Sequence, residues 1–311
     1  MVSDLDRRLA AIALKQHSLI SLGDVLAEGG SAQIPKRRCQ AGFWEWVHPG
    51  VYRLAGVPWT YEARVMAALL AAPQGSLVSH LCACRLQGLG FKTAGIELTI
   101  PRGREFELKG VIVHTSRDLR YAKPVSPEGI PTTGPDRTLL DLAGRMKYST
   151  SVKKAVEEGR RLELVSWSSL IECLADHSRQ GRPGISKLRE VVAVGAHRDE
   201  ITDTDSELAA LSLFREYGFP EPAMQHRLYG DEGILQAEMD FAYLDRMVDF
   251  EINGAVHLLP AVIRKDEKRD YWLAQRGWTV RRIWWEIPVF EPVEFVRIVR
   301  ETLAGAPIVN H

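Results

Sequence analysis

Residues 239–257, MDFAYLDRMVDFEINGAVH, constrain the fold more than any other stretch of the chain. Two runs of alternating polar and apolar residues flank a short polar break, a pattern that predicts a β-hairpin with one buried face. Asp240, Asp249 and Glu251 lie within these runs, although acidic side chains are depleted in strands. The fold must therefore either expose these carboxylates to water or bring them together.

The alternation assigns the side chains of the second strand to its two faces. Asp249 and Glu251 share one face, because successive strand residues point in opposite directions. The other face is predicted to be the core side and carries Val248, Phe250 and Ile252. If the loop has an even number of residues, Asp240 pairs opposite Asp249 and diagonally to Glu251, with neighbouring carbons roughly 5–8 Å apart.

Carboxylates at that separation repel one another, and each raises the pKa of its neighbours. A divalent cation removes this conflict, and oxygen ligands of this kind suit Mg²⁺ or Mn²⁺. The alternative is an edge hairpin with its carboxylates in solvent. The spacing of the residues leaves both interpretations open.

The zero net charge conceals a difference between the two parts of the chain. Residues 1–200 contain 28 Lys and Arg against 21 Asp and Glu, whereas residues 201–311 contain 12 against 19. A basic segment suits a phosphate backbone, and an acidic one suits metal ions or a solvated surface. The two parts are therefore predicted to be different modules.

The overall composition predicts an ordinary soluble chain of 311 residues, long enough for two or three domains. Its longest apolar runs are far shorter than the ~20 residues of a membrane helix. The start of the chain, MVSDLDRRLA, lacks the apolar core of a secretion signal. The 4 cysteines suit a reducing compartment. These features predict a cytoplasmic protein with no membrane segment.

Residues 1–58 carry the pattern of a winged helix. Helices are predicted at 5–17, from Ser21 to Leu26 and at 31–40, with Ser31 capping the last, and FWEWVHPGVYRL (43–54) predicts a hairpin around a Pro-Gly turn. In such a domain the third helix enters the major groove of DNA. The predicted DNA-binding residues are Lys36, Arg37, Arg38 and Gln40, with Arg53 on the wing. The alternative is a solvated basic helix face.

The rest of the chain divides into a mixed α/β and helical middle region, 59–198, and a final α/β module, 199–311. The middle region is predicted to contain two helices between Thr60 and Leu89, strands at 96–101 and 110–116, and helices at 136–146, 150–160, 166–176 and 184–194. The final module is predicted to contain a helix capped by Ser206, the hairpin strands at 235–252, a helix at 265–276, a strand at 279–285 and a last helix at 291–303.

The final module resembles the Vsr-like branch of the PD-(D/E)xK nuclease superfamily in SELAALSLFREYGFPEP, MDFAY, MVDFEINGAVH and DEKRDYWLAQRGWTVRRI. The positions that match are Glu207, Asp240, Glu251, Gly254, His257, Asp266, Arg269, Leu273, Gly277, Trp278, Val280 and Arg282. The resemblance implies a restriction-endonuclease-like domain that cuts DNA with Mg²⁺ or Mn²⁺. It implies that Asp240 and Glu251 bind the metal and that Glu207 assists.

One position departs from the family pattern. Asn253 stands where the family usually has Asp and the wider superfamily Lys, and an amide can orient a water but cannot act as a base. His257 is a catalytic candidate by its family position, or a hydrogen-bonded structural residue. Arg269 could reach a phosphate, or bond Asp266 or Glu267.

The front of the chain resembles the AbiEi-type antitoxin domain in HPGVYRLAGVP, LVSHLCACRLQGL and GIPTTGPDRTLLDLA. This resemblance covers roughly residues 1–150 and implies DNA binding in bacterial or phage-defence regulation. A toxin partner is compatible with it but not implied. The pair Ser79-His80 is interpreted as a helix cap followed by a packed histidine.

The resulting prediction is an α+β multidomain protein that binds double-stranded DNA and hydrolyses it as a metal-dependent endonuclease. Asp240, Glu251 and Glu207 are the predicted metal ligands, and Asn253 and His257 would position the water or the leaving oxygen. The first alternative is a regulator or antitoxin in which the nuclease fold serves only for dimerisation or DNA wrapping. The second is an RNA-processing nuclease, and a homodimer is compatible with each.

Overall fold

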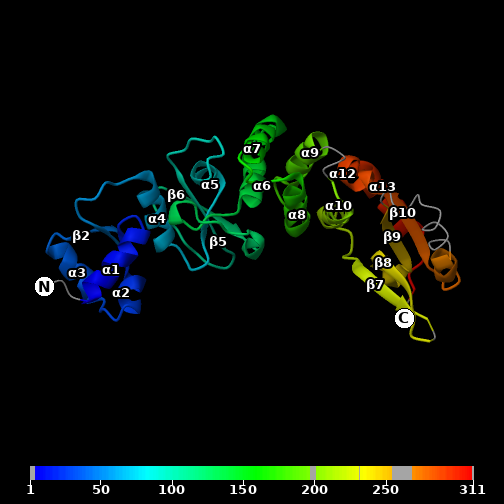
Figure 1. Ribbon diagram of the computed structural model, residues 1–311, viewed down its shortest axis with the longest axis horizontal. Coiled ribbons are helices and arrows are strands. Elements are labelled where there is room, and N and C mark those ends of the chain that lie inside the picture. The colour runs from blue at the N-terminus through cyan, green and yellow to red at the C-terminus, as the bar shows by residue number, and fades with distance from the viewer. Residues whose placement is uncertain (1–3, 197–200, 231, 254–267, 310–311) are drawn as a thin grey trace. The chain divides into compact units, whose positions relative to one another are not determined.

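The computed structural model describes residues 4–196, 201–230, 232–253 and 268–309 (Figure 1). The chain forms two compact units, one of residues 1–142 and 154–164 and the other of residues 143–153 and 165–311. Both combine helices with a β-sheet, which confirms the predicted α+β class. Among the described residues, every helix is too short or too polar to cross a membrane.

The first unit begins with short helices and a small antiparallel sheet. Its elements are α1 (Asp4–Lys15), β1 (Leu19–Ser21), α2 (Leu22–Ala27), α3 (Gln33–Gln40), β2 (Trp44–His48) and β3 (Val51–Leu54). Ser21 caps α2 as predicted, because its side chain and that of Asp24 form a reciprocal capping box. The predicted cap of α3 is wrong, because that helix is preceded by Ala32 rather than Ser31.

Strand β1 was not predicted, and the sheet order is β1-β3-β2. Its residues Leu19 and Ile20 are fully buried, and they lie in the short segment between α1 and α2. Leu9, Val25 and Trp44 pack with Ile20 in a small core under these helices. The strand therefore joins the helices to the β2–β3 hairpin.

The remainder of the first unit is built on a second sheet, of order β4-β5-β6. Its elements are α4 (Tyr61–Ala71), β4 (Leu77–Val78), α5 (His80–Leu86), β5 (Ile96–Pro101) and β6 (Val111–Ser116), followed by α6 (Pro135–Arg145). Strands β5 and β6 are parallel, with Thr99 beside His114. Because side chains alternate along a strand, Glu97, Thr99 and His114 share one face. Leu98 lies on the other face, in the core with α4.

The second unit contains the predicted helices and a larger sheet. Its first helices are α8 (Trp167–His177), α9 (Ile185–Gly195) and α10 (Asp203–Glu216), while α7 (Ser149–Arg161), like α6, is divided between the units. The predicted cap of α10 is wrong. Thr202 caps the helix in a capping box with Asp205, and Ser206 is buried within the first turn.

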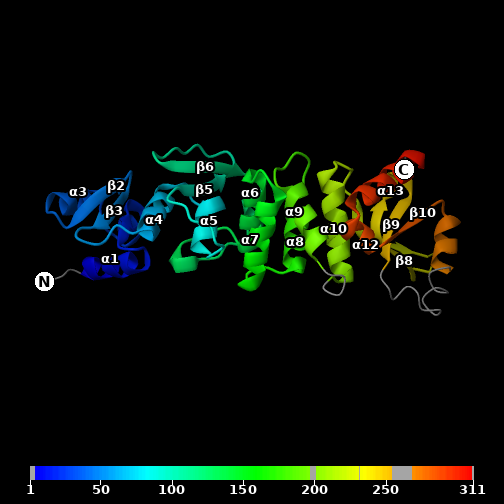
Figure 2. The same ribbon diagram turned by 90° about the horizontal axis from the view of Figure 1, so that it is seen from above.

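The sheet of the second unit has the order β10-β9-β8-β7 (Figure 1), and its first three strands are also labelled in Figure 2. Its strands are β7 (Ala223–Tyr229), β8 (Leu235–Tyr243), β9 (Val248–Asn253) and β10 (Thr279–Trp284), followed by α12 (Glu286–Phe290) and α13 (Pro292–Gly305). Strands β9 and β10 are parallel, and the other pairs are antiparallel. The acidic hairpin is thus flanked by β7 and β10 and is not an edge. Strand β7 and helix α12 were not predicted.

The apolar face of this sheet forms the main core of the second unit. Phe241 and Phe250 pack with Phe214 of α10 and Phe295 of α13, and all four are fully buried. The ring centroid of Phe214 lies 5.3 Å from that of Phe241 and 5.3 Å from that of Phe295. This confirms that the face carrying Phe250 is the core side. The carboxylates therefore lie on the opposite face.

Candidate functional site

The register of β8 and β9 differs from the predicted one by two residues. Phe241 pairs with Phe250 and Ala242 with Asp249, so the same register places Asp240 opposite Glu251. Asp249 is then diagonal to Asp240, and the prediction that these two lie directly opposite is wrong. The connection between the strands is residues 244–247, a 3₁₀ turn that ends at Met247 in the left-handed conformation, and it is two residues longer than a pairing of Asp240 with Asp249 would leave.

Asp240 lies where the paired part of the two strands ends. Its Oδ2 accepts a hydrogen bond of 2.9 Å from the backbone N–H of Ile252. The pKa of Asp240 is raised to about 6, chiefly by burial and also by the charges of Glu251 and Glu207, while the Ile252 hydrogen bond opposes the shift. The carboxyl of Asp240 is therefore held by the backbone of β9, and its pKa is raised by the charges of Glu251 and Glu207.

Asp249 and Glu251 are buried within the sheet, so the alternative of solvent-exposed carboxylates is wrong. Asp249 is 0% exposed and Glu251 3% exposed. Within the described part of the chain, no group donates a hydrogen bond to either carboxylate oxygen of Asp249 or to Oε1 of Glu251. Buried polar oxygens normally accept a hydrogen bond, so these three oxygens on β9 are available to bind a cation or a proton.

The pKa of Asp249 is strongly perturbed in the same environment. Its pKa is raised to about 9, chiefly by burial and also by the charge and hydrogen-bonding capacity of Glu251, while Arg269 opposes the rise. Both side chains are hydrogen-bond acceptors when ionised, so they attract one another only if a proton lies between them. A proton or a cation must therefore neutralise part of this charge.

Arg269 supplies one positive charge to the group. Its Nη2 donates a 2.6 Å hydrogen bond to Oε2 of Glu251 and lies 3.8 Å from Asp270. Asp270 also accepts a 2.7 Å bond from Arg282, which neighbours Glu251 on β10. Arg269 thus contacts the acidic group itself, and the predicted alternative partners Asp266 and Glu267 lie outside the described residues.

The remaining predicted site residues occupy different positions. Glu207, near the start of α10, is half-buried, and burial together with Asp203 raises its pKa. Asn253 ends β9 and is 9% exposed, with no hydrogen-bond donor to its Oδ1 among the described residues. His257 and the family position Gly254 lie outside the described residues.

The predicted DNA-binding residues of the first unit divide into two groups. Lys36, Arg37 and Gln40 are exposed on α3. Arg38 forms an ion pair with Asp6 and lies over the ring of Phe43. Arg53 of β3 donates a 2.6 Å hydrogen bond to Glu45 on β2 and lies 5.1 Å from the ring of Trp59. Arg38 and Arg53 therefore help to hold the hairpin and helices together.

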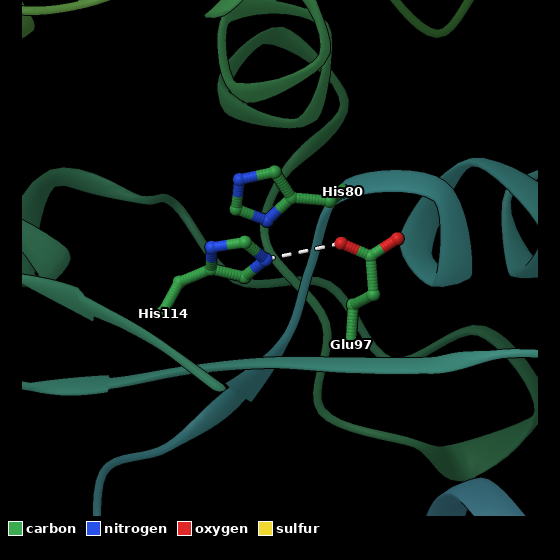
Figure 3. A group of neighbouring side chains, drawn as sticks. All are labelled: His80, Glu97 and His114. Atoms are coloured by element: carbon green, nitrogen blue, oxygen red, sulfur yellow. Dashed lines mark hydrogen bonds and ion pairs between the residues drawn. The ribbon is translucent and has the colours of Figure 1, made fainter. Parts of the chain in front are cut away.

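A second cluster of possible metal ligands lies in the first unit and was missed at the level of sequence. His80 of α5, Glu97 of β5 and His114 of β6 bring one ligand atom each to within 4.8 Å of one another (Figure 3). The predicted cap at Ser79 makes no side-chain cap hydrogen bond, and its Oγ instead lies 2.9 Å from Nδ1 of His80. The only sequence signal is a polar residue on one face of each apolar strand, and the three segments are far apart in the chain.

Comparisons with known proteins identify neither a family nor an activity. No family model matches the chain. A pentatricopeptide repeat-containing protein of Arabidopsis thaliana is 30% identical over 86 residues, which is 28% of this chain and 11% of that protein's length. The crystal structure of the RV2827C protein from Mycobacterium tuberculosis aligns over 76% of this chain and 92% of its own, with 12% identity and a TM-score of 0.41.

Proposed function

We propose that the protein is a DNA-binding, metal-dependent endonuclease whose active site is the acidic face of β8 and β9. The observation that carries this proposal is Asp249, a fully buried carboxylate beside Glu251 with no hydrogen-bond donor among the described residues. Burial of an unneutralised carboxylate is costly, and a divalent cation bound by carboxylate oxygens removes that cost.

The carboxylates of this face are the type of ligand that a hard cation such as Mg²⁺ or Mn²⁺ prefers, although among the described residues the ligand atoms that already lie within 4.8 Å of one another are those of His80, Glu97 and His114. Asp240, Asp249 and Glu251 would hold it, and Glu207 would add charge from α10, which extends the predicted ligand set by Asp249. The bound ion would supply Lewis-acid stabilisation of the negative charge that develops on a phosphodiester. The chain's own contribution is to fix Asp240 through the N–H of Ile252 and to exclude water from Glu251.

Arg269 and Asn253 set the limits of this chemistry. Arg269 bonds Glu251 at 2.6 Å, so it must release part of that contact when a cation binds and then becomes available to a phosphate. Asn253 can orient a water through its amide but cannot remove its proton. A low rate is therefore expected, and Asn253→Asp is expected to increase it.

DNA contact is assigned to the first unit in this proposal. The exposed side chains of Lys36, Arg37 and Gln40 on α3 provide positive charge and hydrogen bonds, in the manner of a winged-helix recognition element. The exposed rings of Phe43 and Trp46 lie next to α3 in the chain, and they are 60% and 63% exposed. These aromatics would give the same surface an apolar contact with the duplex.

Cleavage of supercoiled plasmid by the full-length protein tests the proposal. The native chain with Mg²⁺ or Mn²⁺ is expected to nick or linearise the plasmid, and Asp240→Asn, Glu251→Gln or EDTA to abolish the reaction. Asp245→Asn is the matched control, because this nearby carboxylate is 62% exposed on the turn after β8. Equal cleavage by the native chain and the site variants would assign the activity to a contaminant.

The second candidate is a regulator that binds DNA without cutting it. The ion pair between Arg269 and Glu251 favours it, because this pair already neutralises one carboxylate without any metal. An intact plasmid together with a retarded duplex in a gel would support the regulator and contradict the nuclease. Single-stranded RNA in parallel reactions distinguishes an RNA-processing activity.

A further inference from the structure

We propose that His80, Glu97 and His114 form a second metal site, in the first unit, for a borderline transition metal of the zinc class. The three side chains come from α5, β5 and β6, and their ligand atoms lie within 4.8 Å of one another. Two imidazole nitrogens and one carboxylate oxygen form a ligand set that zinc takes in proteins, with a fourth position left for water or a substrate. This site is independent of the acidic face of β8 and β9.

The packing of the two imidazoles limits which positive charge can balance the carboxylate of Glu97. Their rings are stacked, with centroids 3.7 Å apart and planes 22° apart (Figure 3). If both rings were protonated, two positive charges would lie face to face in a mostly buried place, since His80 is 8% exposed. A divalent ion instead carries the positive charge between neutral rings and the buried carboxylate.

Glu97 supplies the negative charge and links the rings to the sheet. It is 2% exposed, and its Oε2 lies 3.0 Å from Nε2 of His114. The two residues share a face of the parallel strands β5 and β6, because Thr99 pairs with His114 and Glu97 lies two positions before Thr99. The His114 side chain is 27% exposed, so an ion or water can reach the cluster from solvent.

The surroundings of His80 hold its ring and show backbone strain. Thr99 Oγ1 donates a 2.8 Å hydrogen bond to Ser79 Oγ, which lies 2.9 Å from Nδ1 of His80. Such outer contacts orient histidine ligands in metal sites. His80 also has a φ of 55°, in the left-handed region that is strained for a residue other than glycine.

The stacked arrangement has a structural consequence for metal binding. The in-plane lone pairs of stacked rings lie in nearly parallel, separate planes, so they do not converge on one point. One imidazole must therefore rotate about its side-chain torsion when the ion binds, and the rings must separate. Metal binding is expected to change the environment of both histidines and to tie α5 to β5 and β6.

The test is metal binding by the full-length protein after treatment with EDTA and dialysis. Zn²⁺ is titrated by calorimetry, and Co²⁺ is added as a visible probe, because imidazole-bound cobalt in a tetrahedral site gives intense absorption bands. The native chain is expected to bind one Zn²⁺ that Glu97→Gln and His114→Gln each lose. The double variant Asp240→Asn with Glu251→Gln is expected to keep it, which separates this site from the proposed nuclease site.

Thr99→Val keeps the strand and removes only the hydroxyl contact to Ser79, so it is expected to weaken Zn²⁺ binding by about 10–100-fold. Circular dichroism of every variant verifies that the fold is retained. Absence of Zn²⁺ and Co²⁺ binding by the native chain would overturn the proposal. So would unchanged binding in folded Glu97→Gln and His114→Gln proteins, because the ion would then lie elsewhere.

Discussion

Replacement of Asp249 by asparagine is expected to stabilise the second unit at neutral pH. Burial and the charge of Glu251 raise the pKa of Asp249 from 3.8 to about 9. A carboxyl whose pKa is higher in the folded state contributes stability below about pH 4, and that contribution is lost as the pH rises toward about 9. Asparagine cannot ionise and removes this dependence.

The magnitude follows from the pH interval. Between about pH 4 and pH 7 the unfolded chain releases the proton while the folded chain retains it, at about 1.4 kcal/mol per pH unit. The cost at pH 7 therefore reaches roughly 4 kcal/mol, and sharing of the proton with Glu251 reduces it to about 2–4 kcal/mol. With a urea dependence of about 2 kcal/mol per M, the midpoint of unfolding should rise by about 1–2 M.

The assay must report on the second unit alone, because unfolding of a chain with two units is not a single transition. Pulsed thiol labelling in urea with EDTA present, read by peptide mass spectrometry, provides this resolution. Cys173 is buried on α8 in the second unit, while Cys82 and Cys84 are buried in the first. Asp249→Asn is expected to move the labelling midpoint of Cys173 and to leave those of the other two unchanged.

Two further comparisons make this prediction refutable. Asp245→Asn, at an exposed carboxylate on the adjacent turn, should shift no midpoint. When Mn²⁺ replaces EDTA, the stabilisation of the native chain should be larger than the stabilisation of the Asp249→Asn variant. If the Cys173 midpoint at pH 7 is the same or lower in Asp249→Asn, then the carboxylate is already stabilised as an ion. The reasoning that assigns a cation to this face would then be wrong.

Two other perturbations test the core and the DNA surface. Phe214→Ala should destabilise the second unit by about 3–5 kcal/mol in the same labelling assay, because the ring lies fully buried between the sheet and α13. Phe214→Leu should destabilise it less. A loss below about 1 kcal/mol for Phe214→Ala would contradict the central position of the ring. The pair Lys36→Ala and Arg37→Ala should weaken duplex binding and reduce the slope of log affinity against log salt by about 2, measured by fluorescence anisotropy, whereas an unchanged slope would remove α3 from the interface.

The local elements could be predicted from the sequence because they depend on short-range patterns. Helical periodicity gave α1, α8 and α9 to within a few residues, and the alternation in β9 correctly separated Phe250 from Asp249 and Glu251. The caps of α3 and α10 were misplaced, because several residues near each start could have served. Strand β7 was missed because the polar run from Gln225 to Arg227 interrupts the alternation, and because the left-handed backbone of Gln225 breaks the regular strand there.

Which residues meet in space depended on the tertiary structure. The turn at Leu244–Arg246 fixes the register that places Asp240 opposite Glu251, and the neighbouring strand β10 buries what could have been an exposed edge. Burial, in turn, decides whether a carboxylate is merely solvated or needs a counter-charge. The sequence determined that acidic residues share a face, and the structure determined that this face is buried.

The cluster of His80, Glu97 and His114 shows the same division more sharply. Each of its residues is an ordinary polar side chain within its own segment, and no local pattern links a helix start to one position on each of two later strands. Parallel pairing of β5 with β6, and the hydrogen bond from Ser79 to the backbone of Glu97, bring them together. Sequence periodicity determines which way a side chain points from its own element, but only long-range pairing decides what it meets there.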